Sequence, residues 1–442
     1  MCNRTAIHGI LSSPGLRAGA AALLASLVPG GSAHAQQNVG NTAPVVAAYC
    51  LATKPPTLCG NSPPGNLAQV APDRFVVQGV TALQLVTQQF SLVSRRLQER
   101  VVVATGGGLA TRPEAQQPIR LASASEAPLE VFAQSSVAAG GASSVARQPA
   151  LGLYMRVESG GNRVKPTDFD RGFDLHATSL TLGGDYLLNP QTVLGLSYVN
   201  DVARSNLDTG DGGQPGSTNT RAQSIALYAA YRPSAYSYID ATLLAGRNKY
   251  ATVRRFDFEI SKIKDTASGA AQGRQQGLSL GAGYSFARER ITLGPYARVD
   301  YARIDVDAFT EEGGADLNDD GTSNNLRVEA QRFNSLASKL GLQASTAVST
   351  GWGVLVPYAF VEWVHQFKHD RTAQLVAARR DIDSSARMVI NTTPVDRNYG
   401  NLGLGLAAHL GVGRSAALYY QSELGRAGQR ANQLTAELRL EF

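Results

Sequence analysis

The sequence predicts an all-β membrane protein: a twelve-stranded antiparallel up-and-down β-barrel, preceded by one long α-helix and a short disordered N-terminal segment. Two observations favour this fold class. After Leu151, apolar and polar residues alternate, which is the period of a strand with one face in lipid and the other in a wet lumen. The connections between these segments are tight and long in turn, as in outer-membrane barrels with periplasmic turns and longer external loops.

Residues 1–35 are predicted to be a signal peptide. Arg4 and Arg17 supply positive charge, residues 18–28 form a short apolar run, and 33–35 read Ala-His-Ala, an A-x-A cleavage site. Cleavage is therefore expected between Ala35 and Gln36, and the alternative is a cytosolic amphipathic N-terminus. No later stretch approaches the roughly 18 consecutive apolar residues of a transmembrane helix, so none is expected in the mature chain.

Residues 36–72 form a short exported segment that is polar and rich in proline. Cys50 and Cys59 enclose a Pro-rich loop within it, and an exported cysteine pair predicts a disulfide in an oxidising compartment. Two free thiols are the alternative.

Residues 73–104 are predicted to be an amphipathic helix, because apolar residues recur at the three- and four-residue spacing of one helical face. At 1.5 Å per residue, the core of this helix (74–103) would be about 45 Å long, more than the thickness of a bilayer core. The sequence leaves two positions open for it: inside the barrel as a pore helix, or outside as a coiled-coil stem. Residues 105–150, rich in Ala, Ser, Gly and Pro, are predicted to be a linker.

The barrel is predicted over 151–442. Its twelve expected strands are 151–161, 172–188, 191–204, 221–232, 235–250, 274–288, 290–306, 329–348, 352–368, 397–411, 413–425 and 430–442. An even number of strands places Leu151 and Phe442 at the end with the tight turns, so the first strand can pair with the last and remove both edges.

The barrel region carries three further motifs: Gly-Leu-Tyr-Met-Arg-Val at 152–157, Thr-Leu-Gly-Gly-Asp-Tyr-Leu-Leu at 181–188 and Thr-Val-Leu-Gly-Leu-Ser-Tyr at 192–198. With the terminal Leu440-Glu-Phe442, they make residues 150–442 resemble the C-terminal translocator barrel of monomeric (type Va-like) autotransporters. The resemblance implies type V secretion in a Gram-negative cell, with export by the Sec translocon and insertion by the outer-membrane barrel assembly machinery. That machinery would read Leu440 and Phe442 as an assembly signal.

The expected function is translocation or display of the protein's own short N-terminal segment at the cell surface, with adhesion as the broader role. One alternative is a porin-like or scaffold barrel without a passenger, and another is an outer-membrane barrel enzyme. Enzymatic activity is not expected, because the mature histidines (176, 365, 369 and 409) show no catalytic spacing. The expected surroundings are outer-membrane lipid, and the protein is expected to be a monomer.

Five charged residues are predicted to face the lumen, where they would either set an ion preference or pair as structural supports: Arg298, Lys339, Glu362, Glu437 and Arg439. Inward glycines, among them Gly195, Gly281, Gly283, Gly403 and Gly405, are expected to leave room for a helix. The apolar stripe of that helix, with Leu83, Phe90 and Leu97, is expected to gain little from a wet wall.

The remaining patterns exclude other partners. The net charge of +6 is spread along the chain without a Lys/Arg block, so no nucleic acid is expected. Residues 316–321 have the spacing of a calcium loop, but Arg327 stands where the closing glutamate belongs, so neither a metal nor another cofactor is expected.

Overall fold

The computed structural model describes residues 75–103, 150–166, 172–208, 216–258, 263–288, 291–314, 325–369, 375–379, 388–390, 396–410 and 413–442. The predicted cleavage site at Ala35 and Gln36, the Cys50–Cys59 pair and the loop 316–321 lie outside the described residues.

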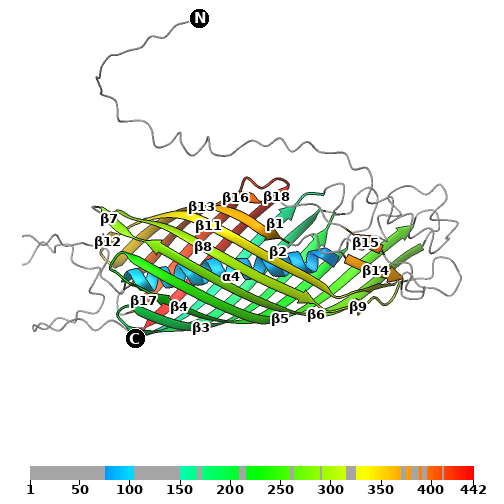
Figure 1. The fold of residues 1–442 in the computed structure, drawn as a ribbon, viewed down its shortest axis with the longest axis horizontal. Helices are drawn as coiled ribbons and strands as arrows, with labels where there is room; N and C mark the ends of the chain where they lie inside the picture. Colours follow the sequence, from blue (N-terminus) through cyan, green and yellow to red (C-terminus); the bar gives the residue numbers. More distant parts are fainter. Residues whose placement is uncertain are drawn as a thin grey trace, which may run out of the picture. The chain divides into compact units, whose positions relative to one another are not determined.

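The described strands form a closed antiparallel barrel around a single helix, α4 (Val76–Val103) (Figure 1). Its twelve strands are β1 (Leu151–Val164), β2 (Phe173–Asn189), β3 (Thr192–Leu207), β4 (Ser217–Tyr231), β5 (Ser237–Phe258), β6 (Ile263–Tyr284), β8 (Ile291–Val306), β11 (Gln331–Thr346), β13 (Gly353–His369), β16 (Asn398–His409), β17 (Arg414–Leu424) and β18 (Gln429–Glu441). Two short strands, β7 (Phe286–Arg288) and β12 (Val348–Thr350), extend the hairpins β6–β8 and β11–β13.

Closure of the barrel occurs between β1 and β18, which pair from Gly152 opposite Glu441 to Val164 opposite Gln429. The amide of Phe442 also donates to the Leu151 carbonyl at 2.9 Å. Pairing of the first strand with the last leaves no free edge in lipid. The predicted fold class is confirmed.

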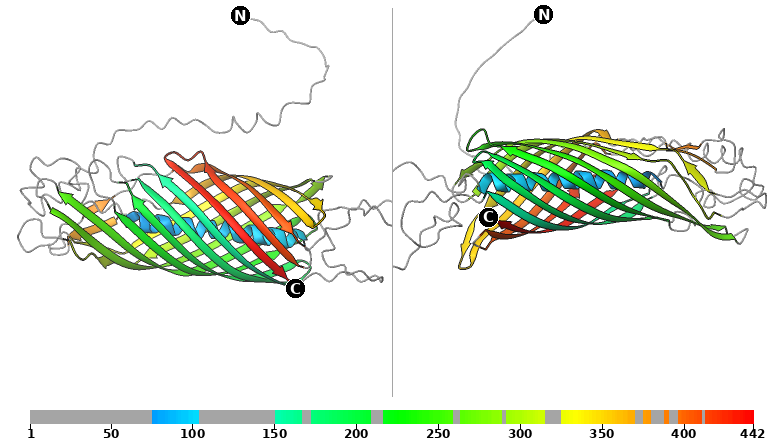
Figure 2. Two further views of the ribbon diagram at one scale, coloured as in Figure 1. Left: turned by 180° about the vertical axis from the view of Figure 1, so that it is seen from behind. Right: turned by 90° about the horizontal axis from the view of Figure 1, so that it is seen from below.

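The two ends of the barrel differ. The turn end carries the short connections, such as that between β2 and β3, together with Leu151 and Phe442 (Figure 2). The loop end carries the long connections. There, four short strands form a second sheet in the order β15-β14-β10-β9, which the sequence predicts only as loops: β9 (Phe309–Thr310), β10 (Leu326–Val328), β14 (Leu375–Arg379) and β15 (Met388–Ile390). Strands of two to five residues are too short to show a period.

The β5–β6 hairpin is also longer than the sequence predicts. A loop was expected over 251–273, but β5 continues to Phe258 and β6 starts at Ile263. In this part of the hairpin both faces carry polar or small side chains, with Arg255 outside and Thr252 inside. Without an apolar face, the alternation that marks a strand disappears from the sequence.

The outer face of the barrel is apolar. Leu196, Leu227, Leu243 and Leu280 are each at least half exposed, as expected for side chains whose solvent is lipid rather than water. Aromatic residues gather toward the turn end, where Tyr236 stacks on Tyr284 at 5.8 Å between ring centroids. Aromatic side chains at such a level suit a membrane interface.

The inner face is close-packed, and the inward glycines have a different role from the one expected. A Cβ on Gly195 would lie 2.1 Å from the ring of Tyr228, so this glycine accommodates an aromatic side chain of the neighbouring strand rather than the helix. The same arrangement recurs at Gly283 under Tyr238, Gly403 under Phe360 and Gly405 under Tyr419, while Gly281 lies under Arg298 and Asp240. The helix itself packs at Gly277, where a Cβ would lie 2.3 Å from the ring of Phe90.

Candidate functional site

The candidate functional site is the lumen with α4 inside it, running from the loop end to the turn end (Figure 2). At the loop end, Phe75 contacts Phe309 edge-on, with ring centroids 5.2 Å apart. At the turn end, Val93 and Leu97 pack with Tyr154 and Tyr228. The helix therefore lies within the barrel, and not outside it as a stem.

The loop-end half of the helix is held by apolar packing. Leu83 and Phe90 are 4% and 0% exposed, and they belong to one cluster with wall residues of β3 to β8 such as Ala222 and Ile304. The expectation that this stripe gains little from the wall is wrong, because this part of the wall is lined with Ala, Leu and Ile. Full burial of one such side chain contributes roughly 1.5–3 kcal/mol.

The turn-end half of the helix carries two arginines that contact different walls. The guanidinium of Arg96 forms a buried ion pair with Asp185 of β2, with 2.8 Å between Nε and Oδ2. Arg95 points the other way, donates to the side-chain oxygen of Gln421 at 2.5 Å and lies over the ring of Phe360. Two neighbouring residues thus contact β2 on one side and β13 and β17 on the other.

Cations of the wall in turn donate to the helix. Lys339 bridges the hydroxyl of Ser91 and the carboxylate of Asp300, with 2.9 Å to each oxygen. Arg156 approaches the carbonyl of Leu92 at 3.4 Å. Each of these hydrogen bonds comes from a charged donor, and such bonds are stronger than neutral ones.

Arg298 completes this set of wall cations. It pairs with Asp240 at 2.8 Å, and the same guanidinium donates to the hydroxyl of Ser94 on the helix. It also donates to the hydroxyl of Ser279 on β6 at 2.7 Å. The ion pair of the wall and the contact to the helix thus share one side chain.

The five charged residues predicted for the lumen all point inward and are buried in the structure: Arg298, Lys339, Glu362, Glu437 and Arg439. Glu437 accepts from Arg439 and from Arg156, with 2.5 Å to Nη2 of Arg156. Glu362 accepts from the hydroxyl of Tyr296 at 2.8 Å. Two of their partners were not singled out from the sequence: Arg156 and Asp240. A charged residue at an inward position of an otherwise apolar strand, such as Arg156 between Met155 and Val157, is the signal that identifies them.

Polar residues of the helix also form hydrogen bonds with the wall, closer to the loop end than the two arginines. Gln78 donates to Thr252 at 2.9 Å, and Gln84 accepts from Asn162 at 2.7 Å. The side chain of Glu99, further along the helix, lies outside the described residues.

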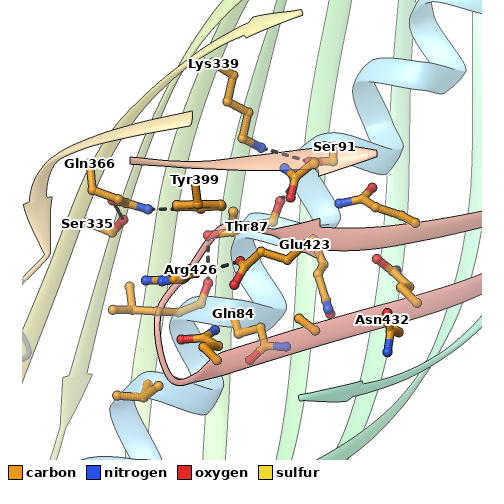
Figure 3. A pocket seen from close by; sticks show the side chains of 18 residues that line it. Gln84, Thr87, Ser91, Ser335, Lys339, Gln366, Tyr399, Glu423, Arg426 and Asn432 are labelled. Atoms are coloured by element: carbon orange, nitrogen blue, oxygen red, sulfur yellow. Dashed lines mark hydrogen bonds and ion pairs between the residues drawn. The ribbon is translucent and has the colours of Figure 1, made fainter. Parts of the chain in front are cut away.

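A polar cavity of about 100 Å³ lies between the helix and the wall formed by β11, β13 and β16 to β18 (Figure 3). The helix contributes Gln84, Thr87, Gln88 and Ser91. On the wall, Arg426 lies over the ring of Tyr399 at 4.6 Å and pairs with Glu423 at 3.3 Å. A polar cavity of this volume has room for several water molecules.

His365 and the chain terminus lie apart from the lumen contacts. His365 shares a hydrogen bond of 2.8 Å with Asn398, and its ring meets Phe367 edge-on at 4.7 Å. Leu440 and Phe442 are exposed on the outside at the turn end. Within the described ranges, no group of three or more His, Cys, Asp or Glu side chains has the geometry of a metal site. The one helix described, α4, is not apolar enough to cross a membrane.

These features define a class: β-barrel proteins of the bacterial outer membrane whose lumen holds a helix. The family model of the autotransporter beta-domain matches residues 153–421, and the chain belongs to this family. As such a barrel, it is an outer-membrane translocator domain of type V secretion.

Individual known proteins are also similar to parts of this chain. An uncharacterized protein in the trpE-trpG intergenic region of Pseudomonas putida is 30% identical over 44% of this chain and 30% of its own length. An extracellular serine protease of Serratia marcescens is 24% identical over 66% of this chain and 26% of its own length. The chain thus spans less than a third of either relative. The translocator domain of the autotransporter NalP from Neisseria meningitidis shares the fold, with a TM-score of 0.52, 14% identity, and coverage of 66% of this chain and 89% of that domain.

Proposed function

We propose that this protein exports its own N-terminal segment, residues 36–72, through the barrel to the cell surface and keeps α4 in the lumen afterwards. The direction of the helix carries this proposal. Phe75 lies at the loop end, so the chain that precedes it starts from the end with the long connections. Display of this segment in adhesion is the broader role.

Surface labelling tests the proposal. An epitope inserted between Cys50 and Cys59 should be labelled by antibody in intact cells. As a control, the same epitope at Ser234, in the turn between β4 and β5, should be labelled only after the outer membrane is permeabilised. If the Cys50–Cys59 epitope behaves like the Ser234 epitope, the segment is not exported and the proposal fails.

The route to the membrane is part of the same proposal: cleavage of the signal peptide between Ala35 and Gln36 after Sec export, then insertion by the barrel assembly machinery. Phe442 is 65% exposed, and its amide pairs with Leu151 at the closure. Deletion of Phe442 should reduce the heat-modifiable, folded form on a gel, whereas Phe442→Tyr should retain it. Normal folding of the deletion variant would contradict a role of the terminal aromatic in assembly.

The polar cavity supports a second candidate, a porin-like barrel that exports nothing. Its lining of Gln, Asn, Thr and charged side chains offers a wet path beside the helix. Single-channel current through the full-length protein separates the two candidates. A porin conducts with the helix in place, whereas an exporter sealed by α4 conducts strongly only without it.

A further inference from the structure

The outer surface of the barrel carries a group of cations that neither the lumen nor the export of a segment explains. We call it the basic belt. It consists of Arg221 on β4, Arg247 and Lys249 on β5, Arg274 on β6, Arg303 on β8 and Arg332 on β11. All six occupy outward positions of their strands, and all but the half-buried Arg303 are exposed.

The register of the sheet brings these side chains together. Arg247 lies directly opposite Arg274, and Arg221 lies directly opposite Lys249. Directly opposed side chains on one face have Cβ atoms about 4.5–5.5 Å apart, and like charges at that distance destabilise a sheet. The barrel thus places two cation–cation pairs side by side across three strands.

Carboxylates form ion pairs at only one edge of the belt. Asp305 accepts from Arg303 at 2.9 Å and from Arg332 at 2.7 Å. The same carboxylate lies opposite Arg274 in the register of β6 and β8. A second carboxylate, that of Asp307, belongs to a residue paired with Gln272 and not with a cation, since its backbone amide donates to the Gln272 carbonyl. No ion pair with a carboxylate is found, among the described residues, for the four cations of the two opposed pairs: Arg221, Arg247, Lys249 and Arg274.

The belt lies at the level of lipid headgroups. Toward the turn end, the apolar outer band includes Leu227, Leu243 and Leu278, which are opposed to one another in register. Arg247 lies four residues after Leu243 on β5, and Arg274 lies four residues before Leu278 on β6. Four residues correspond to about 13 Å along a strand. The belt therefore borders the hydrocarbon region at the loop end, where a guanidinium can bind a phosphate in bidentate geometry.

We propose that the basic belt binds the phosphate groups of outer-leaflet lipid headgroups, seated across β4, β5 and β6. A phosphate placed between two opposed cations replaces their repulsion with two charge-assisted hydrogen-bonded contacts. The occupant is a lipid, and not a free anion, because the cations adjoin a surface that acyl chains cover.

The other half of the barrel offers a matched control. Arg163 on β1 and Arg430 on β18 are also exposed, opposed to each other and near the loop end. There, however, one cation forms an ion pair, since the guanidinium of Arg163 lies 3.7 Å from the carboxylate of Asp174 on β2.

The experiment uses the folded full-length protein in a zwitterionic detergent. Mixed micelles carry either a glycolipid with two phosphates (diphosphorylated lipid A) or the same glycolipid with its phosphates removed, and native mass spectrometry counts the bound lipid. The wild type should retain only the phosphorylated form. The quadruple variant Arg221→Gln/Arg247→Gln/Lys249→Gln/Arg274→Gln should bind it at least about tenfold more weakly, because each cation near a lipid surface contributes about 1 kcal/mol. The double variant Arg163→Gln/Arg430→Gln should bind it as the wild type does.

Three results would overturn the proposal: equal retention of both glycolipids by the wild type, equal losses in the quadruple and double variants, or displacement of the bound glycolipid by inorganic phosphate at a similar concentration. A stability measurement separates binding from folding. In lipid-free detergent the quadruple variant should unfold at a temperature no lower than the wild type, because two repulsive pairs are removed. A lower unfolding temperature would show that the cations stabilise the barrel itself and would also overturn the proposal.

Discussion

The two halves of α4 are held in the lumen by different interactions. The loop-end half, around Leu83 and Phe90, lies in an apolar cluster with small wall residues. The turn-end half, around Arg95 and Arg96, is held by ion pairs and charged hydrogen bonds. Apolar packing is non-directional and sets how strongly the helix stays, whereas buried ion pairs require one register and rotation. The loop-end half therefore keeps the helix in the lumen, and the turn-end half sets its register and rotation.

Removal of the whole helix should have the largest effect. Deletion of residues 74–103 takes away both sets of contacts and opens the full lumen, so single-channel current in planar bilayers should rise sharply. A deletion of equal length in the linker, residues 110–139, should leave the current at the level of the full-length protein. Equal currents in the helix deletion and the full-length protein would mean that α4 does not restrict the pore.

Phe90→Ala tests the apolar half. Loss of a fully buried phenylalanine typically costs about 3–5 kcal/mol, and Gly277 opposite it has no side chain to fill the space. The helix should leave the lumen more often, which is measured as a higher frequency of open-channel events with unchanged current per event. Phe90→Leu, which keeps most of the volume, should show a smaller increase.

Asp185→Asn tests the charged half. It leaves Arg96 buried without its anionic partner, and removal of one member of a buried pair costs about 3 kcal/mol or more. The double variant Asp185→Leu/Arg96→Met should be more stable in urea than the single one, because no buried charge is left unpaired. If both variants unfold at the same urea concentration, the pair does not position the helix.

The smallest effect is expected beside the polar cavity. Ser91→Ala removes one hydrogen bond from Lys339, which keeps Asp300 as its partner. A loss of about 1 kcal/mol is expected, seen as a small decrease in the urea midpoint. Thr87→Ala is the control on the same face, because its hydroxyl donates within the helix to the Leu83 carbonyl. A loss of stability for Ser91→Ala as large as the roughly 3–5 kcal/mol expected for Phe90→Ala would contradict the division into two halves.

Most of the strand pattern was predictable because lipid imposes a strict period of two on the outer face. Strands such as β3 show it plainly, with Leu194, Leu196 and Tyr198 all exposed outside. Where the outer face leaves lipid, the rule no longer applies. The extension of β5 to Phe258 and the small loop-end sheet were therefore missed.

The candidate site was predictable only in part. Inward charges such as Arg298 and Lys339 followed from strand parity, but parity does not identify which anion each one meets. Arg298 pairs with Asp240, a residue 58 positions away, because the register places both residues opposite Gly281. The glycines were misassigned for the same reason, since the ring that covers Gly195 belongs to the neighbouring strand.

By itself, the sequence determined the barrel, its number of strands, the two ends and an amphipathic helix before it, because each follows from local periods and connection lengths. Only the tertiary structure decided that the helix packs its apolar stripe on one part of the lumen wall and leaves a polar cavity beside the rest. It also decided that four outward cations meet in opposed pairs on the lipid side. Both results depend on which residues closure and register bring together, and a pattern along one strand carries no information about its neighbour.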